Sequence, residues 1–71
     1  MNKLARVLDA ESYEWLYSQH PTLADAVEAE VNTGATPESI RRFVLRHTGG
    51  RLEIAYRCEL AARYLVGQKE K

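Results

Sequence analysis

Apolar residues recur every three to four positions along most of the chain, which is the spacing of amphipathic helices. The pattern is interrupted at Pro21, Gly34, Pro37 and the pair Gly49–Gly50. No window shows the sustained alternation of apolar and polar residues that marks a half-buried strand. The pattern therefore predicts an all-α fold, a compact bundle or orthogonal array of four short helices, or five if the first segment is divided.

Capping signals set the expected boundaries. Thr22 is the expected N-cap of a helix over 23–32, which Gly34 ends, and Thr36 is the N-cap of a helix over 37–48. A last helix is expected over 51–66, closed by Gly67. The first segment, 3–19, is one helix or two: Leu4, Leu8 and Trp15 share one helical face, but Asp9 or Ser12 could cap a fresh helix.

The two middle helices show ordinary amphipathicity. The apolar stripe of the helix over 23–32 consists of Leu23, Val27 and Val31. That of the helix over 37–48 consists of Ile40, Phe43, Val44 and His47, with His47 expected as a packed or edge residue and not as a ligand.

The last helix has two apolar faces. One is broad and rich in small residues, and we expect it to form the main core contact with Cys58 buried in its middle; it consists of Ile54, Ala55, Cys58, Ala61, Ala62, Leu65 and Val66. The other consists of Tyr56, Leu60 and Tyr64, spaced i, i+4, i+8. A surface helix needs only one apolar face. Either the helix is buried on both sides or the Tyr56–Leu60–Tyr64 face binds a partner.

The net charge is zero, but residues 1–30 are acidic and residues 31–71 are basic. Such asymmetry can mark a binding face, or it can let the two halves attract each other. Three pairs at i, i+4 spacing would neutralise much of the basic half by supporting single helices. These pairs are Glu38–Arg42, Glu53–Arg57 and Glu59–Arg63.

The 71 residues are expected to form one domain, 1–71, with no cofactor and no metal. The single cysteine excludes an intramolecular disulfide, and His20, His47 and Cys58 show no spacing typical of a catalytic or metal-binding motif. We therefore expect no enzymatic activity and no small-molecule substrate. No apolar run is long enough for a signal sequence or a membrane span, so a cytoplasmic protein is the default expectation.

Residues 33–43 combine a turn glycine, a Thr-Pro helix start and an Ile-Arg pair. This segment resembles the turn and recognition-helix start of MerR-type helix-turn-helix regulators. The resemblance implies that the second helix lies in the major groove of DNA, with contacts from Thr36, Glu38, Arg41, Arg42 and Arg46. A capped turn between two helices would select the same residue types, so that interpretation stays open.

These patterns lead to one prediction of function and two alternatives. The prediction is a non-catalytic protein–protein interaction module, a homodimer or a binder of another protein, that uses Tyr56, Leu60 and Tyr64. The first alternative is a small DNA-binding protein of helix-turn-helix type. The second is an accessory protein that acts on a larger assembly through its acidic N-terminal half.

Overall fold

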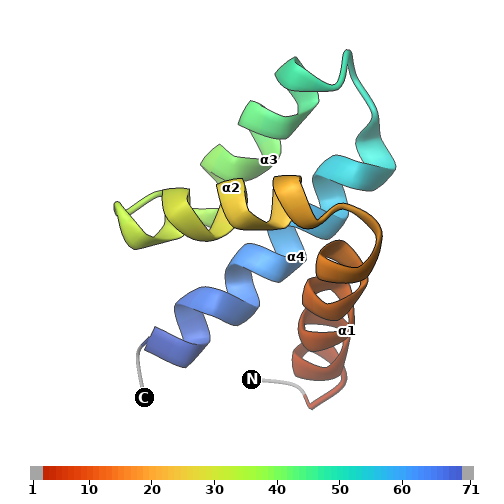
Figure 1. Cartoon of the computed structure of the whole chain (residues 1–71). Coiled ribbons are helices and arrows are strands. Elements are labelled where there is room, and N and C mark those ends of the chain that lie inside the picture. Colours follow the sequence, from red (N-terminus) through yellow and green to blue (C-terminus); the bar gives the residue numbers. More distant parts are fainter. Residues whose placement is uncertain (1–2, 70–71) are drawn as a thin grey trace.

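The computed structural model describes the backbone of residues 3–69 and the side chains of residues 8–69. Over this range the chain forms four α-helices and no strand, as the hydrophobic pattern predicts: α1 (Lys3–Gln19), α2 (Pro21–Asn32), α3 (Pro37–His47) and α4 (Leu52–Lys69). The first segment is thus one continuous helix. Figure 1 shows α4 running diagonally through the molecule, with α2 crossing in front of it and α1 and α3 on different sides. Each of the other three helices contacts α4.

The start of α3 is the best defined helix boundary. The Thr36 hydroxyl accepts a hydrogen bond from the Ser39 backbone N–H at 3.2 Å, and the Ser39 hydroxyl accepts one from the Thr36 backbone N–H at 3.1 Å. Pro37, which lacks an N–H, occupies the first helical position. This reciprocal capping confirms Thr36 as the N-cap.

Two expected boundaries are wrong. Helix α2 begins at Pro21 after His20, so Thr22 lies inside its first turn instead of capping it. Proline is favoured at that position because its fixed φ is already helical. Helix α4 continues through Gly67 to Lys69. Glycine lowers helix stability by about 1 kcal/mol relative to alanine but does not by itself end a helix.

The core is formed where the small residues of α4 meet the other helices. Ala55, Cys58, Ala61 and Ala62 are fully buried, as expected for a face that lets neighbouring helices approach closely. The rest of the buried apolar core consists of Leu60 of α4 and of residues from the other three helices: Leu16, Ala24, Val27, Val31, Ile40 and Val44. In α3 the ridge of Ile40 and Val44 is buried, whereas Phe43 and His47 lie exposed at its margin with their rings 4.1 Å apart.

The buried face of α1 differs from the expected one. Leu8 is 45% exposed and Trp15 is half-buried, whereas Asp9, Ser12 and Leu16 are buried; the side chain of Leu4 lies outside the described residues. Asp9 and Ser12 fall on the same helical stripe as Leu16, about 100° from the stripe of Leu8 and Trp15. A hydrophobic pattern cannot indicate a stripe that contains two polar residues.

Candidate functional site

The three residues of the predicted partner face do not form one exposed surface. Tyr56 is 54% exposed, but Leu60 is only 6% exposed. Tyr64 is half-buried, and its ring lies 4.9 Å from that of Tyr13 in α1. The second apolar face of α4 is therefore divided: α1 covers the part near Tyr64, and Leu60 belongs to the interior. Of the three, only Tyr56 is exposed.

Leu52 is a surface residue that the sequence interpretation missed. It is 69% exposed and lies one helical turn before Tyr56 on α4. Its i, i+4 relation to Tyr56 extends the original stripe by one turn towards the helix start, and this spacing could have revealed it. We call the exposed side of α4 that carries these two side chains the Leu52–Tyr56 surface.

A cavity of about 270 Å³ adjoins this surface. We call it the Trp15 cavity. Its wall combines apolar and charged groups from α1, from the start of α4 and from the residues that precede α2 and α4: Trp15, His20, Arg51, Leu52, Glu53 and Ile54. The Trp15 ring lies 5.2 Å from the His20 ring, and the Arg57 guanidinium lies 4.6 Å from the Trp15 centroid. The cation–π contact fixes the indole against α4.

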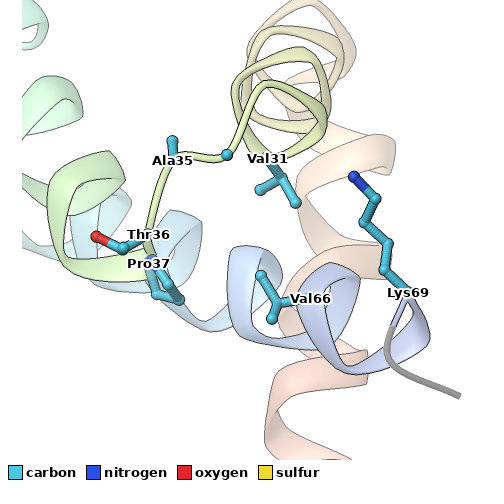
Figure 2. Close-up of a pocket in the computed structure, with 7 residues that line it drawn as sticks. Val31, Ala35, Thr36, Pro37, Val66 and Lys69 are labelled. Carbon is cyan, nitrogen blue, oxygen red and sulfur yellow. The ribbon is translucent and has the colours of Figure 1, made fainter.

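A second cavity, of about 300 Å³, lies between the α2–α3 turn and the end of α4. Figure 2 shows the side chains of Val31 and Val66 pointing into it from α2 and α4. Lys69 supplies the one ionisable side chain of its described wall. Thr36 also lines it, but its hydroxyl is already engaged as the α3 cap. The cavity therefore offers an apolar surface with no pair of groups suited to acid–base chemistry.

The residues of the helix-turn-helix resemblance are divided between structural and exposed positions. Thr36 caps α3, and Arg41 lies 3.4 Å from Glu59 of α4. Glu38, Arg42 and Arg46 are exposed along the outer side of α3. The turn between α2 and α3 is compact, and Gly34 adopts a φ of 100° that favours glycine. Glu38, Arg42 and Arg46 are therefore the three of the five predicted residues that are exposed and take no part in the α3 cap or in the Arg41–Glu59 contact.

The expected salt bridges within single helices are wrong. In the described part of the chain, Glu59 pairs with Arg41 across the α3–α4 contact, and Arg63 lies 3.6 Å from Asp9 across the α1–α4 contact. Arg57 contacts Trp15 instead of pairing with Glu53. Arg41 and Arg63 are about equally exposed, at 42% and 43% of their side chains, so burial of the arginine does not decide which one pairs with Glu59. The Asp9–Arg63 contact also joins the acidic and basic halves of the chain.

Three buried or half-buried ionisable groups have shifted pKa values. Burial raises the pKa of Asp9, which the nearby Arg63 only partly offsets, and one carboxylate oxygen of Asp9 has no hydrogen-bond partner. Burial raises the pKa of the Cys58 thiol to about 11, so it stays protonated at neutral pH. A hydrogen bond from the Tyr17 hydroxyl to Glu28 raises the pKa of Tyr17 and ties α1 to α2. None of the three lines either cavity.

Comparisons of the chain with protein-family models, with curated proteins and with solved structures give no match. In the described part of the chain, no three His, Cys, Asp or Glu side chains lie close enough together to hold a metal ion. Within the same residues, every helix is too short or too polar to cross a membrane.

Proposed function

We propose that this protein is a non-catalytic protein–protein interaction module that self-associates through the Leu52–Tyr56 surface. The observation that carries the proposal is the exposure of two large apolar side chains, Leu52 and Tyr56, one turn apart on the central helix. Covering such side chains removes apolar area from water, at about 25 cal/mol per Å². The buried Cys58 agrees with residence in a reducing compartment such as the cytoplasm.

Three further features support a second copy as the partner. Tyrosine is favoured at interfaces because its ring can be buried while its hydroxyl remains hydrated. The chain also carries no net charge at pH 7, so two copies do not repel each other through their overall charge. A 71-residue domain has a small core, and association would add apolar burial to it.

The test is sedimentation velocity of the wild type and of Leu52→Asp over a range of concentrations. Position 52 is the first residue of α4, where an acidic side chain is compatible with the helix. We expect a concentration-dependent dimer for the wild type and a dissociation constant raised by roughly 30-fold or more in Leu52→Asp. The matched control is Ala26→Asp, which adds the same charge to the exposed side of α2 and leaves the dissociation constant unchanged. A monomeric wild type at the highest concentration would refute self-association.

A second candidate function is DNA binding through α3. It is supported by the exposure of Arg42 and Arg46, one turn apart on the outer side of the helix that follows the turn. The exposed Asp25 and Glu30 of α2 oppose it, since they would repel phosphates. We therefore rank it second.

Binding of duplex DNA at low salt, followed by fluorescence anisotropy, tests this second candidate. If it is correct, the double variant Arg42→Gln, Arg46→Gln weakens binding and lowers the slope of log affinity against log salt by roughly 2. The control, Arg51→Gln with Lys69→Gln, removes two exposed cations at the ends of α4 and keeps the wild-type slope. Absence of any binding at low salt removes this candidate.

A further inference from the structure

We propose that the exposed side of α3 binds a single strand of nucleic acid. We call this side the Arg42–His47 surface; it consists of Arg42, Phe43, Arg46 and His47, all of them exposed. The inference goes beyond the proposed self-association, because it uses another helix and needs no second copy. It also differs from the helix-turn-helix candidate, in which α3 would read a duplex while α2 crosses the DNA backbone.

The arrangement of the four side chains alternates two cations with two rings. Arg42 and Arg46 are four residues apart, as are Phe43 and His47, so each pair forms one stripe and the two stripes adjoin. The arginines are about 6 Å apart along the helix axis, which is close to the spacing of successive phosphates in an extended strand. The surface can therefore contact the backbone and the bases of one strand side by side.

The two rings supply faces on which bases can stack. The Phe43 and His47 ring centroids lie 4.1 Å apart, with the ring planes tilted by 33°. The His47 Nδ1–H donates a hydrogen bond to the Phe43 backbone carbonyl at 3.3 Å, which holds the imidazole beside the phenyl ring. The phenyl ring is still 39% exposed and would gain from being covered. Unpaired bases stack on such rings, whereas the bases of a duplex are already stacked on each other.

The charge of the surface is complementary to phosphate. Residues 39–52 contain four arginines and no Asp or Glu. Within the described residues, Arg42 and Arg46 belong to no ion pair, so neither charge is already neutralised by a carboxylate of the chain. Glu38 is the one carboxylate of α3, and it lies in the first turn, away from the Arg46 end of the helix. A phosphate at Arg46 therefore meets a cation without a neighbouring carboxylate on the same helix.

The acidic half of the chain lies away from the same end of α3. Helix α3 packs mainly against α4, contacts α2 only slightly and does not contact α1 in the described structure. Figure 1 shows α1 and α3 on different sides of the molecule. Glu30 precedes the α2–α3 turn and so lies near Pro37, whereas Arg46 lies about 14 Å further along α3. A single strand across the Arg46 end thus avoids the carboxylates that oppose docking of α2 and α3 together on a duplex.

The test is fluorescence anisotropy at low salt with three labelled probes of about 12 nucleotides: oligothymidylate, oligouridylate and a DNA duplex. We expect the DNA and RNA single strands to bind alike, because phosphates and base faces are common to both. The duplex should bind roughly tenfold more weakly, because it offers no unstacked base to Phe43 and His47.

Two variants test the two parts of the surface. Phe43→Leu removes the ring but keeps an apolar side chain, so it separates stacking from folding, and far-UV circular dichroism checks that the helices remain. We expect it to raise the dissociation constant for the single strands roughly tenfold. Arg42→Gln with Arg46→Gln should lower the slope of log affinity against log salt by roughly 1.4, since each phosphate contact with a single strand contributes about 0.7.

The matched controls change the same kinds of side chain elsewhere. Tyr56→Leu removes an exposed ring from α4 and should keep the wild-type dissociation constant. Arg51→Gln with Lys69→Gln removes two exposed cations and should keep the wild-type slope.

The outcomes separate this inference from both candidate functions. Preference for single strands that is lost in Phe43→Leu but not in Tyr56→Leu supports it. Duplex binding as tight as single-strand binding, or a wild-type dissociation constant in Phe43→Leu, overturns stacking on this surface. Displacement of the strand by polyglutamate as readily as by unlabelled oligonucleotide also overturns it, because polyglutamate carries charge but no bases. Absence of single-strand binding at low salt overturns the inference and leaves self-association, which sedimentation measures separately, unaffected.

Discussion

Leu60 provides the sharpest test of how α4 is used, because sequence and structure assign it to opposite environments. On the sequence it belongs with Tyr56 in a partner face; in the structure it is 6% exposed within a single chain. We predict that Leu60→Ala destabilises the monomer. Burial of a leucine side chain contributes about 1.5–3 kcal/mol, and the cavity left by truncation adds to the loss, so Leu→Ala changes cost about 2–5 kcal/mol.

A loss of about 3 kcal/mol is large for this chain, since the core of so short a domain supplies roughly 3–5 kcal/mol. The midpoint of thermal unfolding should fall by about 12–24 °C, at about 4–8 °C for each kcal/mol. Urea unfolding, followed by far-UV circular dichroism at concentrations low enough to keep the chain monomeric, measures the change. The matched variant Tyr56→Ala, on the exposed side of the same helix, should change the free energy of unfolding by less than about 0.5 kcal/mol. If Leu60→Ala unfolds like the wild type and instead weakens association, Leu60 faces a partner and the packing described above is wrong.

Three further predictions follow from single side chains. Cys58, buried and with a pKa raised to about 11, should not react with a thiol reagent at pH 8 in the folded protein but should react fully in urea; rapid labelling without denaturant would contradict its burial. Arg63→Gln should lower stability by about 1 kcal/mol at pH 7, because the buried Asp9 carboxylate loses its cation. Burial raises the pKa of Asp9 in the folded state, so this carboxyl is protonated more readily in the folded than in the unfolded chain. The stability lost in Arg63→Gln should therefore become smaller as the pH falls from 7 to about 4, as measured by urea unfolding. A loss of stability that does not depend on pH would exclude Asp9 as its cause. Thr36→Ala should cost about 1 kcal/mol of unfolding free energy by removing the α3 cap, whereas a Thr36 reserved for DNA contact would leave stability unchanged.

The parts of the fold that could be predicted from the sequence are those governed by local chemistry. The capping role of Thr36 follows from hydrogen bonds within four residues, and the turn at Gly34 follows from a backbone angle. The small-residue face of α4 is also local, since its members recur at helical spacing, and Ala55 and Cys58 are buried as that pattern indicates. Each of these predictions needs only the properties of one helix or one turn.

The predictions that failed needed the arrangement of helices in space. Asp9 lies beneath α4 because Leu16, on the same stripe, is drawn into the core, and Arg63 then reaches across to it. Glu59 likewise pairs with Arg41 of another helix instead of with Arg63 on its own. A sequence gives the distance between two residues on one helix, but not the distance between residues on two helices that cross. The interhelical contacts of α4 were therefore beyond prediction, and so was the loss of Leu60 from the partner face.

An exposed apolar surface is left at the Leu52 end of α4 because the other helices of the described structure cover only part of α4. Helix α4 is central, yet only three other helices are present in the described structure to cover it. The small-residue face is buried in the core, and α1 packs along the side that carries Tyr64. No helix of the described structure covers the Leu52–Tyr56 surface, so these two large apolar side chains remain exposed. The proposed self-association through the Leu52–Tyr56 surface would place a second copy of the chain over these side chains.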